Sequence, residues 1–440
     1  MLFIPTKQGY NAPIFPFYPF PVYNKIMIKH ILKIIRNERS HNIGIWVELF
    51  LVSVFLWYIV DYTYVVISNY YKPMNFDIRH TYELSFGKVE DKTHARDNIP
   101  SVPLGESFDK IMGRMRQNPM IEAASLSILS RPHIGSHSTM NLFRDTLQSV
   151  GLERMVTPDF FHVFRYKSVN GSTEELVEAL KKDEFIISKS IEKELFPDGS
   201  SAKGKEISLE KSDSARLYRI GAVSTNIRYD NFSDWDTYYA RSIPVSYLNS
   251  FPLAYLPLIE VCVRVNPEED HDFINRFRDQ MTEQLRIDGL YLNTVQSIPV
   301  GKRLYQNDNI NDLKIRLFII LFLLVNIFLG ITGTFWFRTQ YRRGEIGLRI
   351  AMGNTPRGIL GMYYTEGILL LILAMIPAMI VFVFVAKADI LYASWNFNVA
   401  RYFIGFGITC LLLLCMIILG IWFPARKAVN IPPAEALRDE

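Results

Sequence analysis

Three short motifs place charged or metal-ligating residues at spacings that are typical of functional sites, and each predicts a different interaction. The segment GSSAKGK, Gly199 to Lys205, fits the first seven positions of a phosphate-binding loop. His133 and His137 have a spacing that on a helix presents two imidazoles to one metal ion. Glu345 and Arg349 have the same spacing, which on a helix favours an ion pair.

The first two motifs are weak. Glu206 stands where a phosphate-binding loop needs a magnesium-binding serine or threonine, and its charge would repel phosphate, so the glycines indicate a solvent-exposed turn. Pro132 and Gly135 oppose a helix through the two histidines, and no third metal ligand is evident. We also find no Ser/His/Asp or Cys/His arrangement. The sequence therefore predicts a noncatalytic protein with no cofactor and no metal site.

The composition is typical of a membrane protein. Of the 440 residues, 49% are hydrophobic, and the apolar residues are concentrated in a few long blocks. The formal net charge is only +4, and there is no dense basic patch with interleaved aromatics, so we exclude nucleic acid as a partner. Cys410 and Cys415 lie inside an apolar block, which leaves Cys262 without a disulfide partner in the large polar region.

Four segments have about the 20 apolar residues that a bilayer requires. These predicted transmembrane helices lie at 43–67, 317–337, 367–385 and 402–422. Glu48 and Asp61 interrupt the first one, and an ionisable group in lipid costs at least ~2.5 kcal/mol unless it reaches an interface or faces protein. Two interpretations stay open for these carboxylates: snorkelling to an interface, and pairing with another helix.

Lysines and arginines are concentrated in three of the connecting segments, and the cytoplasmic loops of membrane proteins are enriched in these residues. We therefore predict that 1–42, 338–366 and the tail at 423–440 are cytoplasmic and that 70–315 is extracytoplasmic. Within the first segment, 27–39 is predicted to form a basic amphipathic helix at the membrane surface. Residues 1–26 are interpreted as an upstream extension or a disordered tail.

Residues 70–315 alternate strand-like and helix-like patterns. The order strand, helix, strand occurs near the start of this region, at 82–86, 108–117 and 121–129. It recurs near the end, at 255–265, 267–286 and 290–298. Two β-α-β units thus bracket a middle portion, which predicts an α+β domain in which one subdomain is assembled from both ends and a second is inserted. In the insertion, 185–195 is predicted to be helical after a short strand, and 217–224 to be a strand.

Residues 338–366 combine charge, small residues and an amphipathic helical pattern between two apolar segments. Glu345 and Arg349 would pair there, and neighbouring apolar residues, including Ile346 and Leu348, supply a hydrophobic surface. Gly353 is typical of a helix end. A short amphipathic helix at the cytoplasmic face suits docking against a soluble partner, and a surface connector without a partner is the alternative.

Four segments resemble the MacB/FtsX-type ABC transporter permeases. EIGLRIAMG at 345–353, followed by Glu366, is similar to the family signature, and FPARKAVNIPPAEALRDE at 423–440 to its closing segment. VTPDFFHVF at 156–164 and ELFPDGSSAKGKEISL at 194–209 resemble recurring parts of the family's extracytoplasmic domain. The chain differs from MacB itself because it has no fused nucleotide-binding domain.

The resemblance implies a four-span permease with a porter-like β-α-β subdomain and an inserted second subdomain outside the membrane. It implies coupling of ATP hydrolysis to motion of the outer domain, called mechanotransmission, through a helix that docks on the ATPase. The residues that the motif match assigns to this coupling are Arg343, Glu345, Ile346, Leu348, Arg349, Gly353 and Pro356.

The partners implied by the resemblance are a separate cytoplasmic ABC ATPase and a second permease copy or paralogue in a dimer. A periplasmic adaptor and an outer-membrane channel are further candidates. We expect a bacterial inner-membrane protein that exports peptides, drugs or lipid-linked cargo. The alternative is an FtsX-like signalling protein that regulates a cell-wall hydrolase. An anchored extracytoplasmic enzyme would not explain the patterned inner helix.

Overall fold

The computed structural model describes residues 33, 35, 37, 39–89, 103–212, 214–387 and 399–430. It divides the chain into two compact units. Met1–Val65 and Lys314–Glu440 form one, called the helical unit below, and Val66–Leu313 form the other, the sheet unit. The predicted extension at 1–26, most of the predicted basic helix at 27–39 and the closing residues 431–440 lie outside the described residues.

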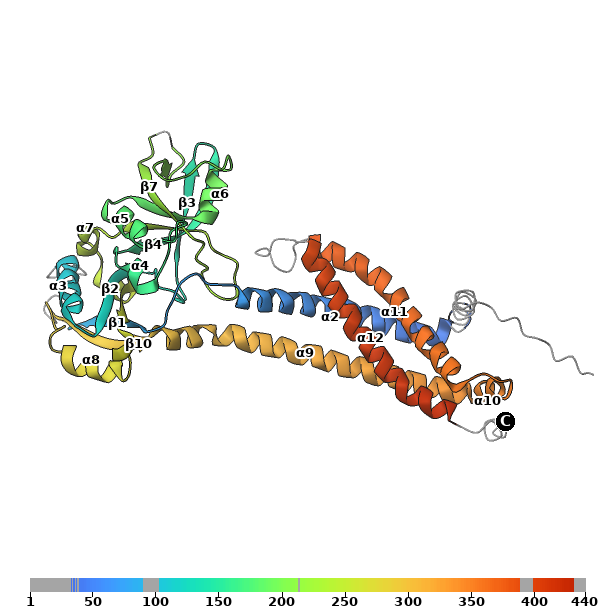
Figure 1. Ribbon diagram of the computed structural model, residues 1–440. Coiled ribbons are helices and arrows are strands. Elements are labelled where there is room, and N and C mark those ends of the chain that lie inside the picture. The colour runs from blue at the N-terminus through green and yellow to red at the C-terminus, as the bar shows by residue number, and fades with distance from the viewer. Residues whose placement is uncertain are drawn as a thin grey trace, which may run out of the picture. The chain divides into compact units, whose positions relative to one another are not determined.

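The strands of the sheet unit form one mixed sheet in the order β10-β1-β9-β2-β4-β3-β6-β7-β5-β8 (Figure 1). Their bounds are β1 Thr81–Lys88, β2 Ile121–Ile128, β3 Ser138–Arg144, β4 Leu147–Val156, β5 Phe185–Ser188, β6 Glu206–Ser208, β7 Leu217–Ser224, β8 Tyr238–Ser242, β9 Ile259–Val265 and β10 Leu290–Ser297. The helical segments of this unit are α3 Leu104–Gln117, α4 Phe160–Phe164, α5 Glu174–Lys181, α6 Lys189–Leu195, α7 Val245–Asn249, η1 Leu253–Leu258, η2 Pro267–Glu269 and α8 Phe273–Met281.

The first part of the sheet is built from the two ends of the unit. Strands β10, β1, β9 and β2 are antiparallel neighbours, and α3 and α8 connect β1 to β2 and β9 to β10. This is the strand order of a split β-α-β fold. Because side chains alternate along a strand, Val261 and Val263 of β9 face the core shared with α3 and α8, while Cys262 joins a second core. The two predicted β-α-β units and the insertion between them are confirmed.

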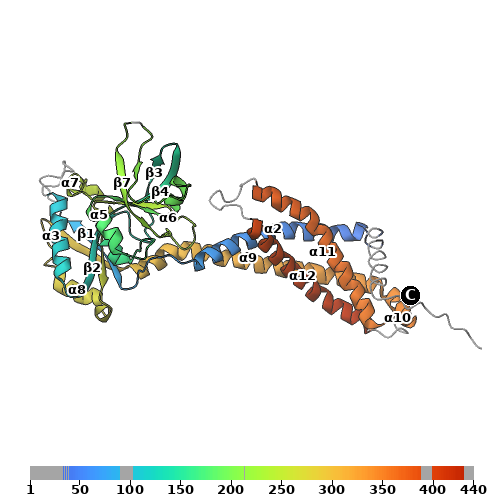
Figure 2. The same ribbon diagram turned by 45° about the horizontal axis from the view of Figure 1, so that its top comes forward.

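The inserted part of the sheet closes on itself. Strand β4 pairs with β3 and also with β8, so β4, β3, β6, β7, β5 and β8 form a ring. Helices α5 and α6 lie on opposite faces of β5 (Figure 2), because Ile186 packs into the core of α5 and Ile187 into the core of α6. The VTPDFFHVF segment forms the end of β4 and then α4, whose Phe160, Phe161 and Phe164 are fully buried.

Three predicted elements differ from the structure. The strand predicted at 255–265 begins only at Ile259, because a 3-10 turn that follows Pro252 and contains Pro257 occupies Leu253–Leu258, and proline has no backbone N–H for a strand pairing. The helix predicted at 267–286 is interrupted by Asp272, whose φ of 53° is left-handed. The helix predicted at 185–195 starts at Lys189, since the first four residues pair with β7 and β8 as a strand.

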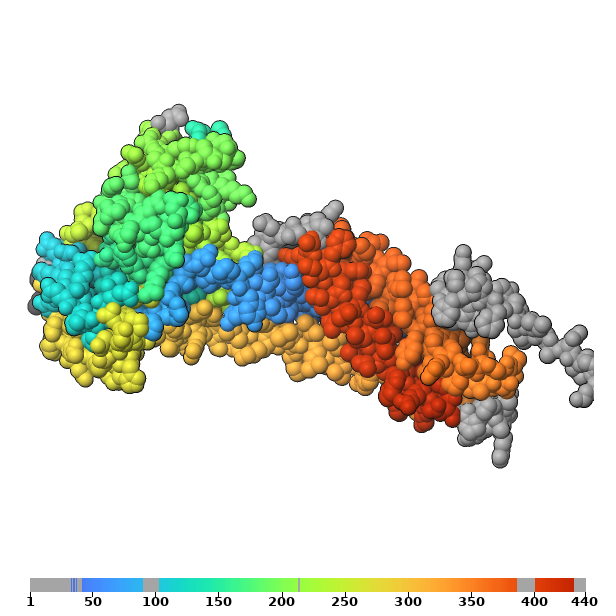
Figure 3. All heavy atoms as spheres, viewed as in Figure 1, coloured from blue at the N-terminus to red at the C-terminus, as the bar shows by residue number. Residues whose placement is uncertain are grey.

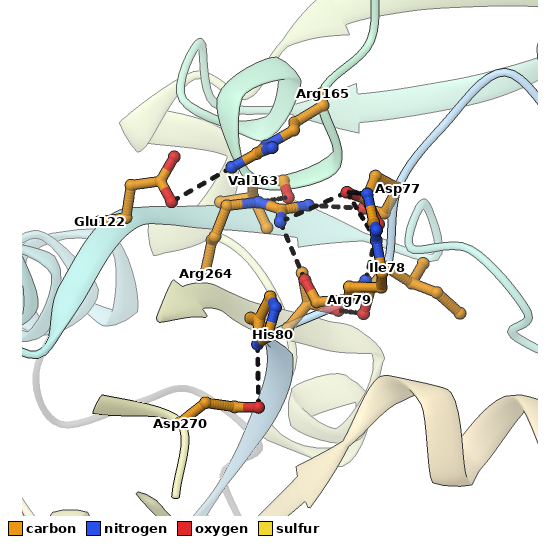
Figure 4. Close-up of polar contacts among 10 residues, drawn as sticks. Asp77, Ile78, Arg79, His80, Glu122, Val163, Arg165, Arg264 and Asp270 are labelled. Carbon is orange, nitrogen blue, oxygen red and sulfur yellow. Dashed lines mark hydrogen bonds and ion pairs between the residues drawn. The ribbon is translucent and has the colours of Figure 1, made fainter. Parts of the chain in front are cut away.

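Arg264 of β9 ties the inserted part to the rest of the sheet unit (Figure 4). Its guanidinium donates to the backbone carbonyls of Val163 in α4 at 2.7 Å, Arg79 at 2.8 Å and Asp77 at 2.6 Å. The residue is 1% exposed. Burial, followed by the charge of Arg165, holds the pKa of Arg264 below its usual value. This buried cation is therefore held mainly by three carbonyl dipoles from two chain segments, 77–79 and α4.

The helical unit contains the remaining helices, and it shares two of them, α2 and α9, with the sheet unit by residue number. The bounds are α2 Arg39–Tyr71, α9 Ile298–Tyr341, α10 Arg343–Ala351, α11 Pro356–Lys387 and α12 Val399–Val429. Four helices of the described chain, all except α10 in this set, are long and apolar enough to span a membrane, which confirms the predicted number.

The four long helices pack through small residues and aromatic side chains. Helices α11 and α12 are in contact (Figure 3), and a Cβ on Gly367 of α11 would lie 2.6 Å from Ile421 of α12. Trp57 of α2 stacks on Phe382 of α11 with ring centroids 4.6 Å apart. These contacts hold α11 against α12 and α2.

Candidate functional site

The candidate site is α10 and the chain turns on either side of it. Arg349 donates from Nε and Nη2 to Glu345 Oε1 at 3.0 and 2.6 Å, so the ion pair that the spacing predicts is present. Ile346 is only 3% exposed and belongs to the core of the helical unit. The helix is thus held against the unit by Ile346, with the partly buried Ile350 packed on the same core, and the ion pair stiffens it along its own axis.

Gly353 ends α10 in a Schellman turn. The N–H of Asn354 donates to the carbonyl of Arg349 at 2.9 Å, and the N–H of Gly353 donates to the carbonyl of Ile350 at 3.0 Å. The turn requires the left-handed φ of 94° at Gly353, a conformation in which a Cβ is unfavourable. Pro356 then occupies the first position of α11, where its missing N–H costs nothing. The sequence pattern predicted that α10 ends at Gly353.

The outward side of α10 is apolar. Leu348 is 51% exposed and Met352 76% exposed, and their spacing places them on one face of the helix. Tyr341, at the end of α9, is 93% exposed. The surface opposite the buried Ile346 therefore carries two large apolar side chains beside the exposed Glu345.

A buried charge cluster lies behind α10. Glu366 of α11 is 1% exposed and accepts from Arg338 Nη1 at 2.5 Å and from Arg342 Nη1 at 3.4 Å. Arg338 also donates to the side-chain oxygen of Asn42 in α2. All four side chains are less than 9% exposed. The cluster joins α2, the end of α9 and α11, and it fixes the two chain ends from which α10 extends.

The sequence reasoning missed this cluster as a unit. Glu366 was named only as part of the family resemblance. Arg338 and Arg342 were counted only among the basic residues of 338–366, and no role was predicted for Asn42. A detectable signal was the carboxylate directly before an apolar segment, which follows two arginines at the end of the previous one, since a charge that becomes buried requires a partner.

The two carboxylates predicted inside the first span have different surroundings. Asp61 pairs with Arg401 of α12, with Arg401 Nε 2.9 Å from Asp61 Oδ1, so this side chain faces another helix. Glu48 is half-buried against Gly330 of α9, where a Cβ would collide with its carboxylate. Glycine at position 330 thus leaves space for the Glu48 side chain between the helices.

The phosphate-loop-like segment and the histidine pair do not have the surroundings that phosphate or metal binding needs. The segment from Gly199 to Lys205 follows helix α6 and precedes strand β6, the reverse of the strand-loop-helix order of a phosphate-binding loop. His133 and His137 lie in an irregular segment. His133 is 3% exposed, and burial, followed by the charges of Lys302 and Arg131, lowers its pKa to about 3. In the described part of the chain, no group of three or more metal-ligating side chains is present.

The helical unit also matches a known family. Residues 317–433, which include the buried charge cluster's arginines, α10, α11 and α12, match the model of the FtsX-like permease C-terminal family. The match confirms the family resemblance carried by 345–353 and by Phe423 to Arg426. With four helices long and apolar enough to span a membrane in its described part, the chain is a multi-pass membrane protein. A search of curated proteins by sequence finds no match.

Solved structures similar to part of this chain include domains of three bacterial proteins. A domain of a putative permease protein from Porphyromonas gingivalis is 15% identical, covers 49% of this chain and 88% of its own, and has a TM-score of 0.31. The periplasmic region of MacB from Actinobacillus actinomycetemcomitans is 11% identical over 52% and 94%, with a TM-score of 0.33. The extracellular domain of the noncanonic ABC-type transporter YknZ from Gram-positive bacteria is 11% identical over 49% and 100%, with a TM-score of 0.30.

Proposed function

We propose that this chain is the permease subunit of an ABC transporter and couples ATP hydrolysis by a separate cytoplasmic ATPase to motion of residues 70–315. The observation that carries the proposal is the apolar face of α10 in the FtsX-like permease domain. Leu348 and Met352 lie exposed on a helix whose opposite side, at Ile346, is buried. Exposed apolar surfaces mark sites of protein or membrane contact, and the position of α10 in a basic connection between two spans favours a protein partner.

The other coupling residues would orient this face. Arg343 begins α10, and the Glu345 and Arg349 pair stiffens it over one turn. Gly353 and Pro356 fix the direction in which the chain leaves it. Movement of α10 would then be transmitted to α9 and α11 through the charge cluster, whereas a flexible connection would absorb it.

The charge distribution supports an orientation with α10 in the cytoplasm. Five arginines lie in or beside the α9 to α11 connection: Arg338, Arg342, Arg343, Arg349 and Arg357. Cytoplasmic loops carry such an excess. In this orientation the termini are cytoplasmic and 70–315 is outside a bacterial inner membrane. A second permease copy or paralogue, a periplasmic adaptor and an outer-membrane channel would complete the machine, with peptides, drugs or lipid-linked molecules as cargo.

The test is Arg349→Glu in the complex reconstituted with the ATPase that copurifies with the full chain. This change puts two carboxylates at i and i+4, which repel each other on a helix. We expect normal membrane insertion and a several-fold loss of permease-dependent ATPase stimulation. The charge-swapped variant Glu345→Arg/Arg349→Glu restores the pair and should recover stimulation. Unchanged stimulation with Arg349→Glu would refute the coupling role.

A further inference from the structure

The last two turns of α12 carry a separate basic and aromatic surface, called the α12 cluster below. Its members are Trp336 of α9 and Trp422, Phe423, Arg426 and Lys427 of α12. Trp422 and Arg426, and likewise Phe423 and Lys427, are one helical turn apart and therefore lie on one face. Trp422 and Phe423 are 50% and 55% exposed.

The opposite face of these turns is buried. Ala425, Ala428 and Val429 are 0%, 7% and 6% exposed and belong to the core of the helical unit. The end of α12 is thus held firmly by its small residues, and the α12 cluster is the side that this packing leaves outward. The outward orientation of the aromatic and basic residues therefore follows from the helix period.

Rings and cations in the cluster are arranged in pairs. Trp336 stacks on Phe423 with ring centroids 5.9 Å apart and planes inclined by 11°. Lys427 Nζ lies 4.5 Å from the centre of the Trp336 ring, and the Arg426 guanidinium carbon lies 5.3 Å from the centre of the Trp422 ring. Such cation-π contacts fix the position of a cation while leaving its hydrogen-bond donors available.

Neither cation of the cluster forms an ion pair with another side chain in the part of the chain that the structure describes. Among the described residues, these two adjacent positive charges therefore have no counter-charge, and they lie at the end of a helix apolar enough to span a membrane. Aromatic residues at such an end mark the level of the lipid headgroups. Arginine and lysine both bind phosphate well, arginine through its planar fork and lysine as a point charge.

We propose that the α12 cluster binds the headgroup of an anionic phospholipid. The rings would lie among the upper acyl chains and glycerol, and Arg426 and Lys427 would contact the phosphate. Charge selects the class of lipid, because a zwitterionic headgroup brings its own ammonium group, which the two cations repel. This site is distinct from α10, and the proposal does not depend on the ABC coupling role.

The experiment is native mass spectrometry of the full chain in detergent, titrated with phosphatidylglycerol or phosphatidylcholine. The intact protein should bind phosphatidylglycerol more tightly. Arg426→Gln/Lys427→Gln should weaken that binding roughly thirtyfold, the factor expected for two interfacial charges, and leave phosphatidylcholine binding unchanged. Arg426→Lys/Lys427→Arg keeps both charges and should retain binding within a few-fold, which separates loss of charge from misfolding.

The matched control is Arg357→Gln, an exposed arginine at the start of α11, which should leave phosphatidylglycerol binding unchanged. Equal losses in this control, or equal binding of the two lipids by the intact protein, would overturn the proposal. Unchanged binding in Arg426→Gln/Lys427→Gln would overturn it too and would assign the cations to another partner, such as carboxylates of residues 431–440. Glycerophosphoglycerol, the water-soluble headgroup, should not compete at millimolar concentration, and competition would overturn the assignment to a lipid.

Discussion

Replacing Glu366 with glutamine removes the carboxylate that lies against Arg338 and Arg342 while keeping the shape of the side chain. Glu366 is 1% exposed, and both arginines are 8% exposed, so neither cation can turn to bulk water without moving a helix end. Loss of one partner from a buried ion pair costs about 3–5 kcal/mol, because the remaining charge stays buried. We expect the free energy of unfolding to fall by about that amount.

The assay is unfolding of the full chain in detergent, followed by steric trapping. Arg357→Gln is the matched control, since this arginine is exposed and its change should stay within about 0.5 kcal/mol. The double variant Arg342→Gln/Glu366→Gln should be less destabilised than the sum of the single variants, which shows coupling in the pair. A loss below about 1 kcal/mol in Glu366→Gln would mean that the arginines are solvated, and the cluster would not brace α10.

Three further changes have expected outcomes. Burial lowers the pKa of His133 to about 3, whereas a histidine in the unfolded chain is protonated as the pH falls below about 6.5. Protonation therefore favours the unfolded state, and the free energy of unfolding should drop by about 2 kcal/mol from pH 7 to pH 5. Hydrogen exchange measures this change. His133→Asn should flatten this dependence and His137→Asn should not; an equal slope in both contradicts the reasoning. Gly353→Ala should cost about 1–2 kcal/mol in the same unfolding assay, because the left-handed φ disfavours a Cβ; no loss would mean that the turn relaxes. Arg264→Met should cost about 3 kcal/mol or more by leaving carbonyls unpaired, and Arg264→Lys should recover little of it; full recovery by lysine would exclude the forked contact.

Local patterns in the sequence were enough for several elements. The four apolar segments, strand β7 at 217–224 and the ion pair of Glu345 with Arg349 depend on composition or on short spacing. The end of α10 also follows from residues close together in the chain, because Gly353 ends this helix and Pro356 occupies the first position of the next.

The tertiary structure decided which distant groups meet. Strand β5 looked helical because its short apolar run is ambiguous, and only pairing with β7 and β8 fixed it as a strand. Glu366 accepts from Arg338 and Arg342, and Arg338 also donates to Asn42 of α2; no spacing along the chain predicts these contacts.

The membrane helices and the amphipathic helix α10 could be predicted from the sequence alone, because hydrophobic periodicity and turn residues act over a few positions. Only the tertiary structure decided that α10 has a buried charge cluster behind it, that Asp61 faces Arg401, and that two cations of α12 lie over tryptophan rings. A buried or partnered charge depends on what the folded chain brings within a few ångströms of it, and that information is spread over residues far apart in sequence.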